Sequence, residues 1–503
     1  MVKVGKLEAG TIADWAPEPG KLISWQPTPA SLTKARQAPV SDVPPSYMQA
    51  QHLRNHRLYA ERGLDLSRLI ISAWDIPGKC DVRAMTHVIN SHLRRHDTYL
   101  SWFEPIDDNQ FVRHTLEKPN DINFVAVQHG EMTTPEQWHE HLMATPTPLE
   151  WDCYRFSVIQ RADHFTFSVA MDHLHCDANF VGVAFAEIHL MYSALASGGA
   201  PIKLAAPGSY HEYCAKQREF TDSLSLNTPA VKKWVDFFER NDGTLPGHPM
   251  PMGDTTVSCT LIGERLMDAR QTAAFEAVCS EAGVRFCGGV FAAAALVERE
   301  LTGTDAYHAI IPIDMRRSPV DFMTNGWFTG FVPITVPTHG DTFADIARAA
   351  QDSFDSGRDL ADVPLDRVLE LAPWLREGDW GAPLLFYLDA GIPPLSAMVN
   401  SHVESLRARL VHDGGLLGQL NVRVNRLEDE TQLTVLHPDN PTAVESVARY
   451  VETLKSIMVR ISEGRDVMPV QQRRSGQLHL AYSSRNTFTT VSDGATLGAR
   501  RIG

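Results

Sequence analysis

The sequence predicts a mixed α/β protein with two lobes of similar size. Its 503 residues exceed what one ordinary hydrophobic core accommodates, so two domains are expected. Strand-like and helix-like segments alternate on both sides of a loop rich in Gly and Pro at 242–249. We therefore predict an N-terminal lobe at 1–210, a linker or crossover at 211–255, a C-terminal lobe at 256–469 and a polar, flexible tail at 470–503.

Composition narrows the class of protein. A hydrophobic share of 43% and a charged share of 21% are typical of a soluble globular chain. The net charge of −15 disfavours nucleic acid as a partner and gives no general attraction to anionic lipid. Seven scattered cysteines without a CxxC pair favour a reducing compartment. The N-terminus lacks the apolar core of a signal peptide, and the longest apolar run, 290–297, is far shorter than the ~20 residues of a membrane helix. We therefore expect a cytoplasmic protein without a membrane span.

In the first half, each predicted element follows from a periodicity or a cap. Asp81 has the place of a helix N-cap, and Met85, Val88 and Ile89 recur after it at helical spacing. Two apolar runs on either side of a polar turn at 161–163 predict a hairpin. The predicted strands are 22–25, 69–74, 123–127, 154–160 and 164–170, and the predicted helices begin at 46 or span 81–97, 134–143 and 180–192.

The second half repeats this alternation. An alanine-rich apolar stretch, 287–301, predicts a buried helix, and 443–461 has the spacing of a long amphipathic helix. Glycines interrupt 325–330 before a further strand begins. The remaining predicted helices are 229–240, 268–282 and 342–358, and the predicted strands are 258–264, 309–313, 331–336, 384–388 and the hairpin pair 419–424 and 432–436.

The segment 171–178, Met-Asp-His-Leu-His-Cys-Asp-Ala, is the first place to look for chemistry. It joins the predicted hairpin to the predicted helix 180–192, deep in apolar sequence. Polar groups buried there are costly unless each has a partner. His173, near its ordinary pKa, can take a proton from a hydroxyl at neutral pH. Asp177 can cap the following helix and fix the loop.

Three other interpretations of this segment stay open. His173-x-His175-x-Asp177 can begin a metal site of the metallo-hydrolase type, although Ala178 stands where a further His ligand is usual. The two histidines can instead be structural residues at the end of a strand. Cys176 can be a nucleophile, but no neighbouring cation lowers its pKa, so a packing role is favoured.

Several separate stretches, in order along the chain, resemble one family. His173 and Asp177 match the second His and the Asp of an HHxxxDG motif, with Asp172 and Ala178 in place of the first His and the Gly. The other matching stretches are 45–51, 95–103, 311–316, 326–333, 362–367 and 383–386. Over about residues 40–465 the chain resembles the condensation-domain and chloramphenicol-acetyltransferase superfamily, and more closely the polyketide-associated acyltransferases (the Pap family) of mycobacterial lipid assembly. A clean DFGWG motif is not visible, and 412–415 lies in its region without matching it.

The resemblance implies two acetyltransferase-like lobes in a V, with a tunnel between them that reaches the histidine from both sides. It implies O-acyl transfer from a thioester, on an acyl carrier protein of a polyketide synthase or on coenzyme A. The acceptor would be a hydroxyl of trehalose, a related glycolipid or a lipid alcohol in cell-envelope lipid biosynthesis. The thioester is a substrate, so neither a cofactor nor a metal is expected. We expect a monomer with at most peripheral contact to the inner face of the plasma membrane.

The resemblance also assigns roles to residues. His173 is the general base, and Asp177 is a structural partner of Arg316, with Arg317 as the neighbouring alternative. The residues expected near the tunnel, or packed beside it, are His175, Asp172 and Trp327. Two rival activities stay open: an amide-forming condensation domain, and a non-catalytic module that binds a carrier protein.

Overall fold

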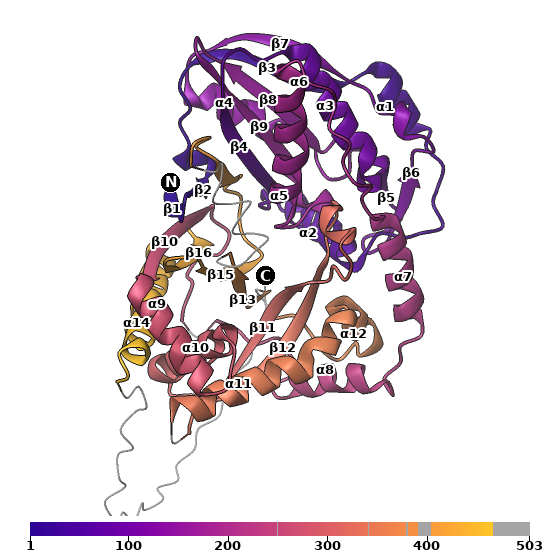
Figure 1. Cartoon of the computed structure of the whole chain (residues 1–503). Helices are drawn as coiled ribbons and strands as arrows, with labels where there is room; N and C mark the ends of the chain where they lie inside the picture. Colours follow the sequence, from indigo (N-terminus) through magenta and orange to yellow (C-terminus); the bar gives the residue numbers. More distant parts are fainter. Residues whose placement is uncertain (249, 341, 379–380, 391–403, 466–503) are drawn as a thin grey trace, which may run out of the picture. The chain divides into compact units, whose positions relative to one another are not determined.

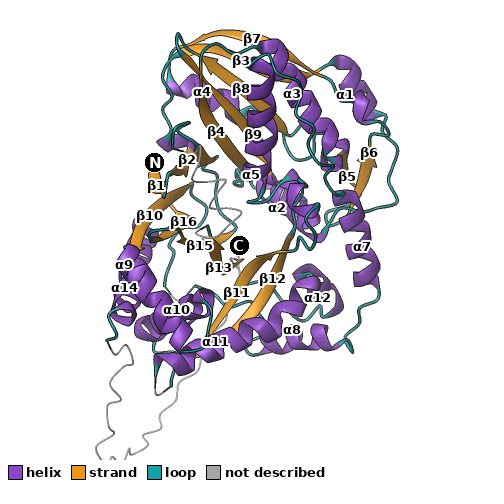
Figure 2. Ribbon diagram, viewed as in Figure 1, coloured by secondary structure: helices purple, strands orange, loops and turns teal. Residues whose placement is uncertain are grey.

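Two large β-sheets, each packed with its own helices, form the two lobes of the structure (Figures 1 and 2), which confirms the predicted two-lobe α/β class. The computed structural model describes residues 1–248, 250–340, 342–378, 381–390 and 404–465. The predicted tail, 470–503, therefore lies outside the described residues.

The first sheet has eight strands in the order β1-β2-β14-β4-β9-β8-β3-β7. Its strands are β1 (Val2–Val4), β2 (Leu7–Thr11), β14 (Arg409–His412), β4 (Leu69–Pro77), β9 (His164–Asp172), β8 (Tyr154–Gln160), β3 (Gly20–Pro27) and β7 (Phe124–Met132). Neighbouring strands are antiparallel except β14 and β2, which are parallel. The predicted hairpin is confirmed as β8 and β9, paired from Tyr154↔Met171 to Gln160↔Phe165.

Strand β14 joins this sheet from far along the chain. It lies between β2 and β4, with Arg409 opposite Ala73 and His412 opposite Ile70. This strand was not predicted, because four residues with a charged or polar group at each end carry no clear strand pattern. Its insertion places His412 in the same sheet as the strand that leads to the central segment.

Helices cover both faces of the first sheet. One face packs against aromatic and aliphatic side chains of α3 and α6, and the other packs against α4 through the Trp15–Trp138 contact. The helices of this lobe are α1 (Pro29–Arg36), α2 (Tyr47–Glu61), α3 (Val82–Arg95), α4 (Pro135–Met143), α5 (Phe180–Ala184) and α6 (Leu190–Ala196). A two-stranded sheet of β5 (Ser101–Pro105) and β6 (Phe111–Thr115) lies beside them.

The predicted helix 180–192 is interrupted. A π-helical turn, Phe185–His189, separates α5 from α6. Such a turn inserts one residue into the helical repeat and rotates the side chains that follow. Here it contains the buried carboxylate of Glu187, which contacts His92 and His96 of the region around α3. Apolar periodicity alone did not reveal this break.

The second sheet has six strands in the order β10-β16-β15-β13-β11-β12. They are β10 (Cys259–Met267), β16 (Thr431–Pro438), β15 (Gln419–Arg426), β13 (Gly381–Asp389), β11 (Ala306–Asp314) and β12 (Thr329–Pro337). The predicted hairpin of β15 and β16 is confirmed, whereas β13 runs parallel to both β11 and β15. Parallel neighbours require crossover connections, which explains the helices α11 and α12 between β11 and β13.

One face of the second sheet packs against the alanine-rich helix α10, which is buried from Gly288 to Val297, and against its neighbours α9, α11 and α14. Helices α8 and α12 cover the other face through a separate cluster around Trp234. The helices are α7 (Tyr210–Asp222), α8 (Pro229–Glu239), α9 (Ala269–Glu281), α10 (Phe286–Thr302), α11 (Phe343–Gly357), α12 (Leu365–Leu371) and α14 (Pro441–Ser462). No single helix in the described ranges is long and apolar enough to span a membrane, although α9 and α10, bent by 96°, meet that test as a pair.

Candidate functional site

The central segment leaves β9 at its last residue and folds locally through its own polar groups. Asp172 ends the strand, and its carboxylate accepts a hydrogen bond from the Leu174 N–H at 3.0 Å, which starts a 3-10 turn over His173–His175. The His173 N–H donates to the Arg68 carbonyl at 2.8 Å, and so ties the turn to the start of β4. These bonds hold the backbone of the segment through groups of the first lobe alone.

The His173 ring lies at the junction of the two sheets. It packs on Trp327, from the segment before β12, with ring centroids 3.8 Å apart and an interplanar angle of 30°. Within the described residues, Nδ1 is buried without a hydrogen-bond partner, whereas Nε2 is neither sealed nor bonded. The residue as a whole is half-buried. The ring therefore presents Nε2 to open space.

Burial is the main cause that lowers the pKa of His173 to about 4, and the nearby His52 adds to it. The backbone carbonyls of His173 and Cys176 and the carboxylate of Asp172 act in the opposite direction, but burial outweighs them. The imidazole is therefore neutral at physiological pH. A neutral imidazole with an accessible nitrogen can accept a proton from a hydroxyl.

Asp172, which replaces the first His of the motif, has its own partners. His52 Nε2 contacts Oδ1 at 2.8 Å, and Arg68 Nη1 donates to Oδ2 at 2.8 Å. Burial alone would raise the pKa of this fully buried carboxyl, but His52 and Arg68 together hold it well below its usual range. Asp172 is thus a fixed anion that fastens α2 and the start of β4 to the end of β9.

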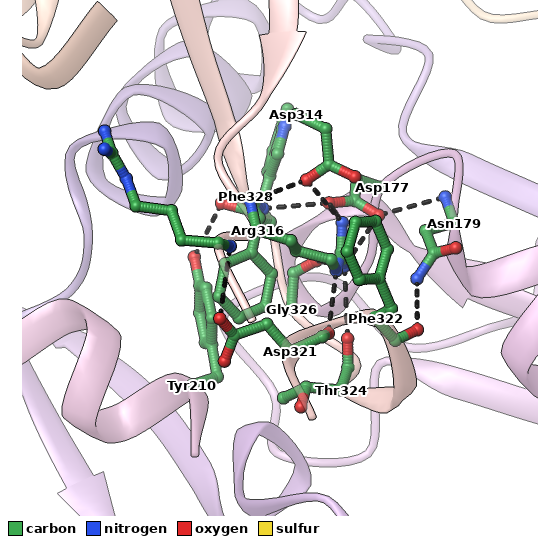
Figure 3. Close-up of polar contacts among 12 residues, drawn as sticks. Asp177, Asn179, Tyr210, Asp314, Arg316, Asp321, Phe322, Thr324, Gly326 and Phe328 are labelled. Atoms are coloured by element: carbon green, nitrogen blue, oxygen red, sulfur yellow. Dashed lines mark hydrogen bonds and ion pairs between the residues drawn. The ribbon is translucent and has the colours of Figure 1, made fainter. Parts of the chain in front are cut away.

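Asp177 is bound to the second sheet (Figure 3). Arg316, two residues beyond β11, grips both carboxylate oxygens, with Nη1 donating to Oδ2 at 2.8 Å and Nη2 donating to Oδ1 at 3.1 Å. The Phe328 N–H donates to Oδ2 at 2.9 Å, and the Asn179 N–H donates to Oδ1 at 3.0 Å. These four bonds occupy the lone-pair directions of both carboxylate oxygens with protein donors.

Arg316 is held as firmly as its partner. Its Nε donates to the Asp321 carbonyl at 3.0 Å, Nη2 donates to the Thr324 carbonyl at 3.1 Å, and its guanidinium lies 4.4 Å from the Phe328 ring centre. The neighbouring Arg317 instead pairs with Asp362 at the surface. The structure therefore pairs Asp177 with Arg316 and not with Arg317.

His175 points away from His173. It is fully buried, with Nδ1 2.9 Å from the Thr98 hydroxyl and its ring against Tyr99 and Tyr154. Because His175 and Asp177 turn in different directions, the three residues of the predicted metal pattern do not converge on one point. The Cys176 thiol is also buried, and burial raises its pKa, as expected of a packing residue.

Among the described residues, one group has donor atoms close enough to share a metal ion. It consists of His92, His96 and Glu187, with all ligand atoms within 4.8 Å of one another. The Glu187 carboxylate already contacts both imidazoles, at 2.8 and 3.0 Å, and accepts a hydrogen bond from Arg95 at 3.0 Å. This network joins α3 to the π-helical turn and lies apart from His173.

Comparison with known proteins identifies the family of this chain. A family model described as "Condensation domain" matches residues 71–377. The "Acyltransferase PapA3" of Mycobacterium tuberculosis (strain CDC 1551 / Oshkosh) is 48% identical over 465 residues, 92% of this chain and 98% of that protein. The "Trehalose-2-sulfate acyltransferase PapA2" of Mycobacterium bovis (strain BCG / Pasteur 1173P2) is 50% identical over 459 residues, 90% and 97% of the two chains. The chain belongs to the condensation-domain family, with the mycobacterial Pap acyltransferases.

Solved structures of the condensation-domain family share the fold. A structure titled "PapA2 acyl transferase" superposes with a TM-score of 0.87 at 49% identity, covering 91% of this chain and 100% of that one. The condensation domain of the Monacolin K polyketide synthase MokA superposes with a TM-score of 0.66 at 14% identity, covering 85% and 99%, which shows the fold alone.

Two residues near the site of this condensation-domain protein were missed by sequence reasoning. His412 ends β14, and its pKa is lowered mainly by burial and further by the charges of Arg423 on β15 and of His173. Neither belongs to a motif. For His412, the sequence offered only the place of 412–415 in the region of the DFGWG motif, which it does not match. For Arg423, it offered an arginine among alternating apolar residues of a predicted strand, which is equally typical of a solvated face.

Proposed function

We propose that this chain transfers an acyl group from a thioester to a hydroxyl of trehalose or a related glycolipid, with His173 as the general base. The observation that carries this proposal is the accessible Nε2 of a neutral imidazole at the junction of two sheets. Membership of the condensation-domain family, and relatives named acyltransferases and a trehalose-2-sulfate acyltransferase, support the reaction class and the acceptor.

The proposed reaction passes one proton through one imidazole. His173 Nε2 takes the proton from the acceptor hydroxyl as its oxygen attacks the thioester carbonyl and forms a tetrahedral intermediate. As the intermediate collapses, the carbon–sulfur bond breaks and the imidazolium returns the proton to the departing thiolate. A low pKa makes the imidazolium a strong acid, which favours this second transfer. Such acid–base help is typically worth ~10²–10⁴-fold in rate.

Asp177 and Arg316 are positioning residues in this mechanism. Their bidentate pair joins the segment after β9 to the residues after β11. Through the Phe328 N–H, the same carboxylate also holds the stretch that carries Trp327 against the His173 ring. The pair therefore sets the position of the base without taking a proton.

The donor and the setting follow from the same proposal. The acyl group arrives on an acyl carrier protein of a polyketide synthase or on coenzyme A, through a tunnel between the lobes. The enzyme works as a monomer in the cytoplasm, in peripheral contact with the inner face of the plasma membrane, where a lipid product would be released. No metal or other cofactor takes part in the proposed steps.

The decisive experiment incubates the purified protein with palmitoyl-coenzyme A and either trehalose or trehalose 2-sulfate. Mass spectrometry should detect the acyl ester, and a thiol assay should detect one coenzyme A per ester. The His173→Ala protein, run in parallel, should form neither. Binding of an acyl carrier protein without any release of thiol would instead identify a non-catalytic module, and acylation of an amine in preference to the sugar would identify an amide-forming enzyme.

A further inference from the structure

Residues 325–328 form a short stretch that covers the base. Trp327, its third residue, packs on the His173 ring, and the N–H of its last residue donates to the Asp177 carboxylate at 2.9 Å. Its first residue, Asn325, is buried, and the hydrogen-bond acceptors of its N–H groups lie in the first lobe. The place of Trp327 over the base therefore depends on both ends of the stretch.

Asn325 is bound to the first lobe by two hydrogen bonds. Its backbone N–H donates to His96 Nδ1 at 3.3 Å, and its side-chain Nδ2 donates to the Tyr99 hydroxyl at 2.9 Å. The same Nδ2 lies 3.4 Å from Nε2 of His92. These three first-lobe side chains are fully buried within α3 or just after it. The stretch that covers the base is thus fastened to this buried group.

Gly326 joins Asn325 to Trp327 without room to adjust. A Cβ at this position would lie 2.2 Å from the ring of Tyr210, so the backbone and the ring are in close contact (Figure 3). The Tyr210 hydroxyl donates to the Trp327 carbonyl at 3.2 Å. Closely packed groups transmit a displacement instead of absorbing it. A shift of Asn325 is therefore expected to reach the Trp327 ring.

His96 must keep one tautomer for its contact with Asn325 to form. A backbone N–H can only donate, so Nδ1 of His96 is the acceptor and the proton of the neutral ring is on Nε2. This Nε2 lies 3.0 Å from Glu187 Oε2, which accepts its hydrogen bond. The Glu187 carboxylate also contacts His92 Nδ1 at 2.8 Å and Arg95 Nε at 3.0 Å. Glu187 thus holds His96 in the form that can accept from Asn325.

The same hydrogen bonds argue against a metal ion in the group of His92, His96 and Glu187. A neutral imidazole that binds a metal through Nε2 carries its proton on Nδ1. In His96 that proton would point at the N–H of Asn325, and two donors would face each other. The group is therefore better described as a hydrogen-bonded support than as a metal centre.

We propose that His96, in the tautomer that Glu187 sets, is a positioning residue for the acyl-transfer reaction. It acts through Asn325 on Trp327, and so on the place of the His173 ring. The inference rests on the proposed function and adds to it a buried residue of the first lobe. Because His96 affects the geometry of the base and not the binding of substrate, its loss should lower kcat and leave KM almost unchanged.

Two substitutions of His96 each keep one of its two contacts. His96→Asn keeps an acceptor near the place of Nδ1 and loses the donor to Glu187, whereas His96→Gln keeps a donor toward Glu187 and loses the acceptor for Asn325. Both should cost a similar folding free energy in urea unfolding, because each loses a buried hydrogen bond. With palmitoyl-coenzyme A and the sugar that the wild type acylates, His96→Gln should lower kcat by about 10- to 100-fold at nearly constant KM, and His96→Asn by less than about threefold. Equal losses of kcat in the two variants would overturn the proposal.

Two milder substitutions keep the test decisive if the His96 variants do not fold. Tyr99→Phe keeps the ring and removes only the hydroxyl that accepts from Asn325, so kcat should fall at nearly constant KM. Thr98→Val removes the contact of the neighbouring hydroxyl with His175, at 2.9 Å, and should leave kcat unchanged although it also loses a buried hydrogen bond. An unchanged kcat in Tyr99→Phe, or an equal loss in both variants, would contradict the positioning role.

A chemical probe of the His173 ring needs no acyl transfer. Diethylpyrocarbonate modifies accessible neutral imidazoles, and mass spectrometry of the peptide that contains His173 gives the rate. His96→Gln should raise this rate above that of the wild type, because the Trp327 cover is displaced, whereas His96→Asn should not. An equal rate in all three proteins would overturn the proposal. If the wild type acylates no sugar, the proposed function fails, and these rates still decide whether His96 positions the ring.

Discussion

His173 and Asp177 lie four residues apart in one segment but have opposite surroundings. The Asp177 carboxylate takes four hydrogen bonds, two of them from Arg316 of the second lobe. The His173 ring touches Trp327, and among the described residues no side chain or backbone group hydrogen-bonds it. The comparison shows a carboxylate that joins the two lobes and an imidazole whose ring has no hydrogen bond among the described residues, which is the difference that the proposed mechanism requires.

The strongest test of this comparison removes the imidazole. We expect His173→Ala to lower kcat by ~10²–10⁴-fold, because general base catalysis is lost. It should cost at most about 1 kcal/mol of folding free energy, because the ring gives up no hydrogen bond. Steady-state kinetics and urea unfolding of the same preparation measure both quantities. A variant that keeps full activity would exclude His173 as the base.

Removing the Asp177 carboxylate should affect mainly the stability of the protein, whereas removing the His173 ring should affect mainly its activity. We expect Asp177→Ala to destabilise the protein by about 3–5 kcal/mol, because the buried Arg316 then loses its bidentate partner and keeps only the half-exposed Asp314, at 3.2 Å, as a counterion. Activity should fall as well, since the position of the base is lost. Urea unfolding gives the free energy of each variant.

Two variants control the Asp177 measurement. Arg317→Ala breaks an ion pair whose arginine side chain is 68% exposed, so it should cost less than about 1 kcal/mol. The double variant Asp177→Ala/Arg316→Met should recover part of the loss, because no buried charge is left unpaired and Asp314, which also loses Arg316, is 44% exposed to water. A cost for Asp177→Ala as small as that of Arg317→Ala would contradict the fastening role.

The pH dependence of kcat/KM examines the His173 environment directly. Only the neutral imidazole is a base, so activity is lost as pH falls through the pKa, which burial lowers to about 4. We expect a flat profile from about pH 5 to 8 and an acid limb near pH 4. An acid limb at pH 6 to 7 would show that the ring is solvated. Circular dichroism must accompany the profile, because burial also lowers the pKa of His175 to about 4. The stability that such a buried neutral histidine contributes is fully present above pH 6.5 and is lost as the pH falls from 6.5 toward 4.

The smallest expected effect belongs to the ring that covers His173. Trp327→Leu opens the imidazole to water, and since burial is the main cause of the low pKa, the acid limb should move upward toward 6.5. Loss of a ring–ring contact worth about 0.5–1.5 kcal/mol should reduce kcat/KM by about two- to tenfold. Trp327→Phe keeps an aromatic cover and should show a smaller shift. An acid limb that stays at pH 4 in Trp327→Leu would place the cause of the low pKa elsewhere.

Much of the fold could be predicted from local patterns. The cap at Asp81, the helix predicted over 268–282, the apolar stretch that became α10 and the two hairpins carry their information within a few residues. The π-helical turn at Phe185–His189 and strand β14 could not be predicted this way. The π-helical turn depends on contacts of Glu187 with His92 of α3 and with His96, which follows that helix. Strand β14 forms by pairing with strands that lie more than three hundred residues earlier in the chain.

By itself, the sequence determined that a histidine and an aspartate follow a buried strand at a fixed spacing, within a condensation-domain chain. Only the tertiary structure decided what each can do, because their partners come from distant segments. Arg316, and not Arg317, binds Asp177, and Trp327 covers the His173 ring. His52 and Arg68 hold the Asp172 carboxyl in its charged form. The burial and charge around a side chain depend on which distant segments pack against it. They give His173 and Asp177, four residues apart, their different surroundings.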